Sequence, residues 1–169
     1  MKYLGFWRRL LAYLIDTVPI MLAVVSLAYF FLGFDEVLRG YFRDTSNLEA
    51  RARFYSQREL LKNLGFLVYL VYCTLMESSR MHATLGKRVV GAMVVSEAGV
   101  PLTLKQALFR NLLKIVSALP LFMGFLIAVF NQKRQAFHDM FAKTYVVERA
   151  AHMESHDRSQ RIVVSRALQ

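Results

Sequence analysis

The sequence predicts an all-α membrane protein with two to three transmembrane helices, interfacial helices and a short hairpin-like segment. Of the 169 residues, 56% are hydrophobic and the mean hydropathy is +0.33, more apolar than soluble domains usually are. The net charge is +10, and the basic residues lie beside the apolar runs, where anionic headgroups attract them. The positive charge therefore indicates a lipid bilayer rather than nucleic acid as its partner.

The first predicted span covers 10–34, a run of 25 residues with one charge, Asp16. That length is sufficient to cross a bilayer with some tilt. Pro19 lies inside the run and can kink the helix. The uncharged part, residues 17–34, is longer than the roughly 7–15 residues of a signal-peptide core. We therefore expect the segment to be retained in the mature protein.

The second predicted span follows a charged segment. Residues 35–59 carry five Arg and five acidic side chains, and this composition predicts a polar loop. The apolar run between Lys62 and Glu77 has only 14 residues, which is short for a span. It is long enough to cross if Lys62 extends to the interface and Ser78 lies at the opposite interface.

Residues 84–102 change in character. The stretch RVVGAMVV is β-branched and SEAGVP is a turn signal, so a small hairpin or irregular interfacial segment fits better than a helix. Thr103 is suited to cap a helix that begins at Leu104, because its hydroxyl can accept a backbone hydrogen bond. Apolar residues then recur at helical spacing: Leu104, Leu108, Leu112 and Ile115.

The third apolar run, 115–132, is uncharged but contains Pro120 and Gly124. A full span here would place Lys133, Arg134 and Lys143 outside, against the positive-inside rule. We expect a re-entrant or interfacial segment, with a third span as the alternative. We expect a membrane domain over 1–149, with a strand-like TYVV near its end, and a disordered polar tail over 150–169.

Asp16 is the first candidate functional residue. Arg9, Ala12 and Asp16 are three and four residues apart and share one stripe of a helix. A carboxylate within the hydrocarbon costs roughly 2.5–3.5 kcal/mol and needs a partner, a water-filled cavity or a proton. Three interpretations remain open: a structural ion pair with Arg9, an ion or proton site, and a charge in the headgroup layer.

The segment QKRQAFHDMFAKTYVV adds Arg134, His138 and Asp139. An unperturbed histidine titrates near neutral pH, and Asp139 supplies a second carboxylate that could approach Arg9 or Asp16 if the chain returns to the inner side. The alternative is an interfacial helix with solvated charges. The sequence offers no nucleophile with a nearby base and no metal-ligand cluster, and TLGK at 84–87 lacks the first glycine of a P-loop. We expect no enzyme, no cofactor and no bound metal.

Four blocks in order, RRLLAYLID, TLGKRVVGAMVV, GVPLTLKQALFRN and RQAFHDMFAKTYVV, resemble the RDD family of small bacterial membrane proteins over residues 5–147. The resemblance implies that the arginine and two aspartates of the family name correspond to Arg9, Asp16 and Asp139. It also implies a role in transport, including monovalent cation/proton antiport, or in assisting a protein complex, as one eukaryotic branch does in protein degradation.

These observations lead to an expected function. The chain is a multi-pass protein of the inner (cytoplasmic) membrane that moves protons against a monovalent cation, with Asp16 as carrier, Arg9 as its electrostatic partner and Asp139 as a second carboxylate. His138, Arg134 and Arg110 are accessory candidates. A few spans cannot enclose a pathway, so we expect a homo-oligomer packed along the stripe of Ala12. The alternative is a non-transporting membrane adaptor in which the same residues are structural.

The predicted topology can be tested by cysteine labelling. In a Cys73→Ala background, a cysteine at Ser46 should react with an impermeant maleimide added outside. A cysteine at Ser155 should react only after permeabilisation, because the basic termini are expected in the cytoplasm. Labelling of both positions from outside would contradict a C-terminal segment that returns to the inner side.

Overall fold

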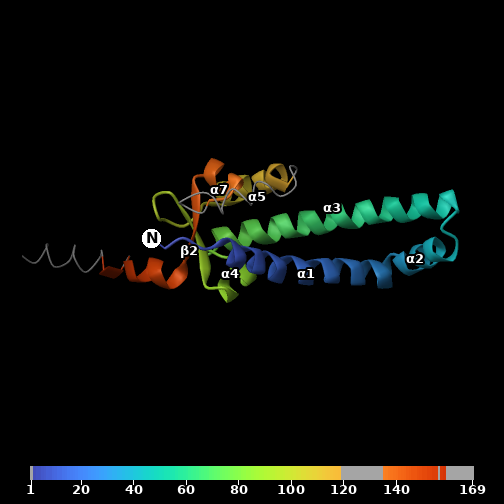
Figure 1. The fold of residues 1–169 in the computed structure, drawn as a ribbon, viewed down its shortest axis with the longest axis horizontal. Helices are drawn as coiled ribbons and strands as arrows, with labels where there is room; N and C mark the ends of the chain where they lie inside the picture. Colours follow the sequence, from blue (N-terminus) through green and yellow to red (C-terminus); the bar gives the residue numbers. More distant parts are fainter. Residues whose placement is uncertain (1, 119–134, 156, 159–169) are drawn as a thin grey trace, which may run out of the picture. The chain divides into compact units, whose positions relative to one another are not determined.

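The computed structural model describes residues 2–118, 135–155 and 157–158. These residues divide into two compact units, a helical unit, Asp16–Val71, and a terminal unit, Met1–Ile15 with Tyr72–Gln169. Figure 1 follows the elements along the chain. Their order is α1 (Phe6–Phe31), α2 (Phe34–Arg43), α3 (Leu48–Ser78), α4 (Leu85–Val89), β1 (Ala92–Ser96), α5 (Leu104–Ala118), α7 (Phe137–Phe141) and β2 (Thr144–Glu148). The predicted all-α membrane class is confirmed, with a two-stranded sheet as its β component.

The helical unit contains most of α1 and α3, connected through α2. Gly33 has φ 64° and ψ 24°, a left-handed conformation that glycine adopts without steric cost, and it turns the chain from α1 into α2. Buried side chains from the three helices form its core: Val24, Ala28, Phe34 and Leu61. Because this core is small, most of the apolar surface of α1 and α3 lies outside it.

The prediction of a polar loop over 35–59 is wrong, because the structure has α2 and the beginning of α3 there. Asn47 caps α3, since its Oδ1 accepts hydrogen bonds from the backbone N–H groups of Glu49 (2.9 Å) and Ala50 (3.2 Å). Opposite charges one helical turn apart then pair, as Arg53 does with Glu49 at 2.7 Å. The charge density that indicates a loop therefore belongs to the solvated faces of helices.

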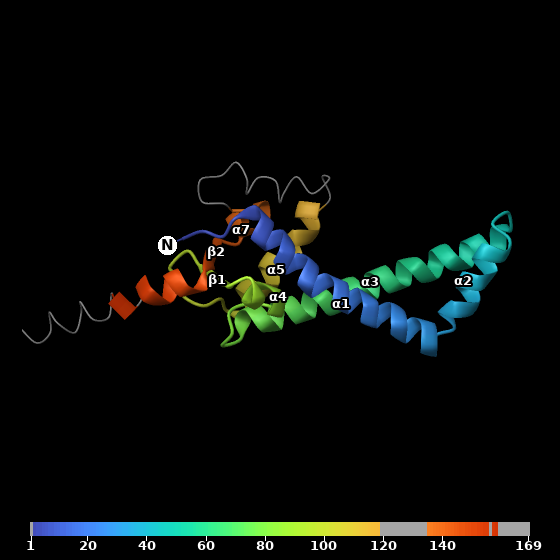
Figure 2. The ribbon, with the colours of Figure 1, turned by 60° about the horizontal axis from the view of Figure 1, so that its bottom comes forward.

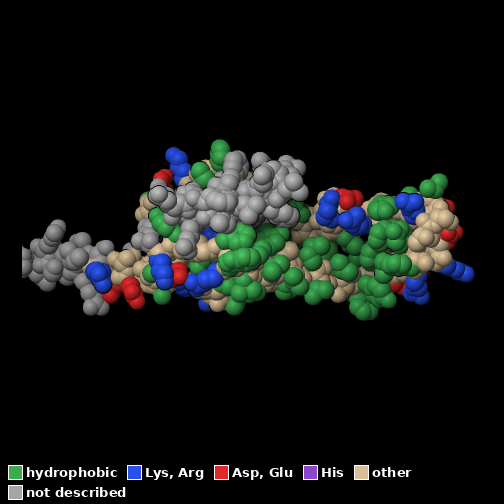
Figure 3. Space-filling view, viewed as in Figure 1, with side chains coloured by type: hydrophobic (Ala, Val, Ile, Leu, Met, Phe, Trp, Pro, Cys, Tyr) green, Lys and Arg blue, Asp and Glu red, His purple; other side chains and the backbone are tan. Residues whose placement is uncertain are grey.

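Two described helices, α1 and α3, are long and apolar enough to cross a membrane. In the most apolar window of each, only 17% and 22% of the residues are buried. Figure 3 shows hydrophobic side chains over the visible surface of these helices and charged side chains near α2. Such exposure suits a lipid environment. The predicted third run, 115–132, lies largely outside the described residues.

The terminal unit is built on an antiparallel pairing of β1 with β2, in which Val94 lies opposite Val146. Tyr3 forms a further bridge to Val147, so the N-terminal segment joins the sheet beside β2 (Figure 2). The short hairpin-like segment expected over 84–102 supplies only β1 to this sheet, and its partner strand is distant in sequence. Pairing across that distance is not visible in a local pattern.

Ala12 lies in the core of the terminal unit, with 1% of its surface exposed. It packs in the same cluster as Leu4, Val90 and Ala107. The expected oligomer contact along the stripe of Ala12 is therefore wrong, because that position is filled by the chain's own residues. Any contact between copies through α1 would use its exposed apolar residues instead.

Helix α5 begins as the sequence predicts. Thr103 Oγ1 accepts from the backbone N–H of Gln106 (3.3 Å), and Gln106 Oε1 accepts from the backbone N–H of Thr103 (3.1 Å), which forms a capping box. The apolar stripe of α5 is exposed, since Leu104 and Leu108 are 54% and 42% exposed. The buried stripe is the one that carries Arg110, at 2%.

The polar tail expected over 150–169 begins as a helix, because residues 149–155 are helical. Residues 159–169 lie outside the described part of the chain.

The connection from α4 to β1 provides a test of the fold. Gly91 has φ 69°, and a Cβ there would lie 3.3 Å from Nη2 of Arg8. Gly91→Ala should therefore destabilise the protein by about 1–2 kcal/mol, measured by thermal unfolding in detergent. The control is Gly40→Ala, where a Cβ meets nothing within 4 Å, and which should be neutral or stabilising by up to about 1 kcal/mol. Equal effects of the two changes would contradict the turn geometry.

Candidate functional site

A buried ionic network centres on Arg110 of α5. Its Nε and Nη2 donate to Oδ1 of Asp139 at 2.9 and 2.7 Å, and its Nη1 donates to Oε2 of Glu77 at 2.7 Å. The side chain of Arg110 is 2% exposed and both carboxylates are 0% exposed. One guanidinium group thus joins α5 to α7 and to the end of α3.

The second oxygen of Asp139 faces α1. Arg9 Nη1 lies 2.5 Å from Asp139 Oδ2, and Arg9 Nε donates to the carbonyl of Leu4 at 3.2 Å. The backbone N–H of Ala136 also donates to Oδ2, at 3.4 Å. Figure 2 shows the first turns of α1 near α7. The sequence suggests that Asp139 approaches Arg9 or Asp16. In the structure, Arg9 lies against it.

Glu77 is a member of the network that the sequence interpretation missed. Lys87 of α4 forms an ion pair with its Oε1, and Lys114 Nζ lies 3.9 Å from the same oxygen. Asn111 Nδ2 donates to its Oε2 at 3.2 Å. The signal in the sequence is the spacing of Arg110, Asn111 and Lys114, which places all three on one side of α5.

Charge and burial fix the protonation states of three groups outside the spans. Burial raises the pKa of Asp139, but the charges of Arg110 and Arg9 and the hydrogen bonds from Arg110 together outweigh burial and hold this pKa well below its ordinary value. Burial lowers the pKa of His138 to about 3, so this side chain is neutral at neutral pH and cannot titrate there as an unperturbed histidine would. Burial, with a smaller contribution from the charges of Arg110 and Lys114, lowers the pKa of Lys87 to about 8, although the charge of Glu77 acts to raise it.

Asp16 belongs to the helical unit and is 5% exposed. The neighbouring Thr17 Oγ1 is buried and has no hydrogen-bond partner among the described residues. Pro19 lies inside α1 and has no N–H to donate to the carbonyl of Ile15, four residues earlier. The relation of Asp16 to Arg9 stays a prediction, and Arg134 lies outside the described residues.

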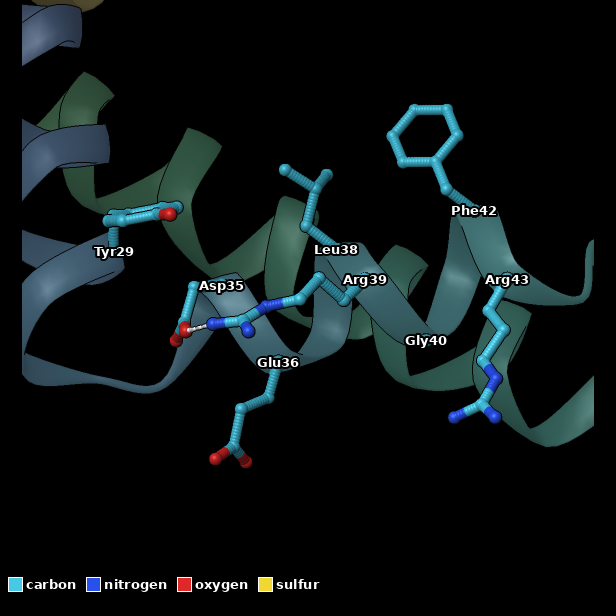
Figure 4. Close-up of a pocket in the computed structure, with 8 residues that line it drawn as sticks. All are labelled: Tyr29, Asp35, Glu36, Leu38, Arg39, Gly40, Phe42 and Arg43. Carbon is cyan, nitrogen blue, oxygen red and sulfur yellow. Dashed lines mark hydrogen bonds and ion pairs between the residues drawn. The ribbon is translucent and has the colours of Figure 1, made fainter.

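The helical unit also has an open hollow beside α2, lined by residues that include Tyr29, Asp35 and Arg39. In Figure 4, Asp35 and Arg39 point toward each other, and Leu38 and Phe42 lie away from Glu36 and Arg43. The Asp35–Arg39 pair is exposed on its arginine side. Exposed, mutually paired charges give this hollow little capacity to bind an ion selectively, so it is not the candidate site.

The network and Asp16 differ in what they can do chemically. Asp139 is held by two guanidinium groups, and its protonation would remove the carboxylate charge that Arg9 contacts and leave Arg110 with Glu77 alone. The network therefore holds fixed charges in place. Among the described residues, no group of three His, Cys, Asp or Glu side chains could hold a metal ion. The described residues include three buried carboxylates, Asp16, Glu77 and Asp139. Glu77 and Asp139 bind Arg110, so Asp16 is the candidate for exchanging a proton or a cation.

Two helices that are long and apolar enough to cross a membrane, with most of their apolar windows exposed, indicate a membrane protein. The pattern of the RDD family matches residues 3–143, so the chain belongs to the RDD family. It is 30% identical over 157 residues to the Bacillus subtilis (strain 168) protein named "Uncharacterized protein YxaI", covering 86% of this chain and 97% of that protein. No solved structure matches the chain.

The network predicts a large effect of Asp139→Asn. The change removes the counter-charge that buried Arg9 contacts and leaves Arg110 with Glu77 alone, which costs about 3–5 kcal/mol and should lower the unfolding temperature in detergent by about 10 °C or more. The control is Glu148→Gln, which breaks the partly exposed pairs with Lys2 and Arg8 and should have a much smaller effect. If both variants unfold at the same temperature, Asp139 does not hold the unit together.

Proposed function

We propose that the protein is a small multi-pass transporter of the cytoplasmic membrane that exchanges protons for a monovalent cation, with Asp16 as the carrier carboxylate. The observation that supports this proposal is the burial of Asp16, 5% exposed, in a helix whose apolar window is only 17% buried. An ionisable group at such depth is expensive, and such groups commonly mark ion or proton pathways. Membership of the RDD family agrees with a membrane role.

Further oxygen atoms lie next to Asp16 in α1. The hydroxyl of Thr17 has no hydrogen-bond partner among the described residues, and Pro19 leaves the carbonyl of Ile15 without its helical donor. Carbonyl, hydroxyl and carboxylate oxygens are the ligands that hard cations prefer, and transporters use freed helix carbonyls in this way. These atoms support a site where a cation and a proton compete for Asp16.

Arg9 and Asp139 then act as positioning residues. Their contact and the bonds of Arg110 hold the beginning of α1 against the terminal unit's own α5 and α7. The neutral His138 lies beside this contact, with Nε2 3.5 Å from Asp139 Oδ1. We propose that the functional form is a homo-oligomer, because two described spans are too few to enclose an ion pathway.

A membrane adaptor is the second candidate, and one observation favours it. Asp139 binds Arg110 through Oδ1 and Arg9 through Oδ2, and the third nitrogen of Arg110 binds Glu77. Such fully occupied groups are expected where side chains hold helices together. Under this alternative, Asp16 is likewise structural, and the protein assists a partner complex without moving ions.

Flux measurements in liposomes test the proposal. The purified protein should dissipate a pH gradient when sodium or potassium is added, and Asp16→Asn should reduce the flux to that of protein-free liposomes while the protein keeps its oligomeric mass. Thr17→Val should retain flux but require more cation, because it removes one ligand oxygen. The matched control, Asp35→Asn, removes a partly exposed carboxylate and should leave the flux unchanged.

Two outcomes would contradict transport by Asp16. A well-folded Asp16→Asn with full flux would exclude it as the carrier. Absence of flux in the wild type, with loss of stability in Asp16→Asn, would favour the adaptor, because the loss of one partner from a buried structural contact is strongly destabilising.

A further inference from the structure

Helix α3 carries a polar stripe on the side opposite its core. The stripe consists of four exposed residues that are spaced four, three and four positions apart: Ala52, Ser56, Glu59 and Asn63. This spacing places them on one side of a helix. Leu61, two residues before Asn63, lies in the core that α3 shares with α1, and two residues correspond to about 200° of rotation. The polar stripe therefore faces away from α1.

The level of this stripe along α1 follows from two contacts within the helical unit. A Cβ at Gly65 would lie 2.7 Å from Sδ of Met21, and the ring of Phe54 stacks on that of Phe34 with centroids 6.4 Å apart. Glu59 lies between Phe54 and Gly65 in α3. It is therefore level with the part of the chain between Met21 and Phe34, which contains the last turns of α1.

At this level the two helices need different surroundings. On α1, Leu27, Phe30 and Phe31 are 58%, 76% and 78% exposed, as suits a lipid-facing surface. On α3, Glu59 and Lys62 form an ion pair whose side chains are 52% and 58% exposed, and charges that face hydrocarbon are costly. Figure 3 shows charged side chains of both signs part-way along α3, with hydrophobic surface on either side. The polar stripe therefore needs a polar cover at a level where α1 needs lipid.

A second copy of this chain fits the charges of that face. Copies inserted with the same topology are related by a rotation axis along the membrane normal, which brings equal levels of α3 together. Glu59 of each copy then lies beside Lys62 of the other, so the face is complementary to itself. The chain's own residues 119–134 contain no Asp or Glu and have no carboxylate to offer Lys62.

The first half of the stripe also has room for a neighbouring helix. A hollow of about 460 Å³ is lined by Ala52, Ser56 and nearby residues of α2 and α3. In membranes, small side chains let helices approach closely, and polar side chains across the contact add to their association. The hollow can therefore receive side chains of a second α3.

We propose that the polar stripe of α3 is the contact between two copies of this chain, in which Glu59 and Lys62 form reciprocal ion pairs. This contact is the interface of the homo-oligomer in the proposed function, on which it rests, but it does not involve Asp16. It can therefore be wrong while Asp16 still carries ions.

Disulfide crosslinking in membranes tests the contact directly. The full-length protein, in a Cys73→Ala background, carries either Asn63→Cys or the matched control Leu64→Cys. Leu64 is 42% exposed and lies at the same level, but it points about 100° away from Asn63. A disulfide needs Cα atoms about 4.4–6.8 Å apart. Oxidation should therefore convert most of the Asn63→Cys protein, and little of the Leu64→Cys protein, into a covalent dimer.

Crosslinking of both variants to the same extent, of Leu64→Cys alone, or of neither would overturn the polar stripe as the contact. The mass of the wild type in mild detergent separates this failure from that of the proposed function. An oligomer that does not crosslink through Asn63→Cys uses another face and leaves the proposed function intact, whereas a monomer removes the homo-oligomer as well.

Charge substitutions test the reciprocal ion pairs. Glu59→Lys places like charges at the same level of both copies and should weaken the dimer in detergent by about tenfold or more, measured by mass against protein concentration. Glu59→Lys/Lys62→Glu exchanges the two charges, keeps the face complementary to itself and should restore most of the affinity. The control Glu36→Lys makes the same charge change at an exposed position of α2 and should leave the affinity unchanged. Equal affinities of the Glu59→Lys and Glu36→Lys proteins would overturn the ion pairs, as would a double variant that binds no tighter than Glu59→Lys.

Discussion

The contact of Arg110 with Asp139 and Glu77 is the interaction on which the terminal unit depends. The three residues come from α5, α7 and the end of α3, and they are separated by 29 and 33 positions in the chain. Arg9 extends the contact to α1, across 130 positions. Because each group is buried, none can lose its partner without leaving a charge in a low-dielectric surrounding. The network therefore requires all of these elements to be in place together.

A lipid environment explains why such a network faces inward. Between helices in a bilayer there is no hydrophobic driving force, so packing and polar contacts hold helices together. Helix α5 follows this rule, since Leu104, Leu108 and Leu112 are exposed while Arg110 and Asn111 are 2% exposed. The sheet of the same unit is different: Val94, Val95 and Val147 are fully buried, as in a water-soluble core. The unit thus combines a soluble type of sheet core with a membrane type of helix packing.

The sequence predicts what depends on local chemistry. The cap at Thr103, the class of the fold and the apolar character of α1 are all visible within a few residues. Local chemistry also explains why a loop is wrongly predicted over 35–59. A helix whose opposite charges pair one turn apart, as Glu49 and Arg53 do, has the same charged composition as a polar loop. What could not be predicted depends on distant partners: β1 pairs with β2 about fifty residues later, and Glu77 is recognisable as a site residue only once Arg110 lies against it. The orientation of α5 is a further case, since periodicity identifies its apolar stripe but does not say whether lipid or protein covers it.

Arg9, Asp16 and Asp139, the residues that the resemblance assigns to the family's arginine and two aspartates, therefore separate into two kinds. Arg9 and Asp139 meet at 2.5 Å, and Asp139 is held ionised by Arg110, so neither can release or accept a proton without breaking the network. A carrier carboxylate must release and accept its ligand repeatedly, because it alternates between a protonated and an ionised form or between a bound proton and a bound cation. Asp16 satisfies that requirement better, since it lies in a candidate span beside hydroxyl and carbonyl oxygens. If the protein moves ions, the arginine and the second aspartate contribute by holding the start of α1 in position, and the exchange itself takes place at the first aspartate.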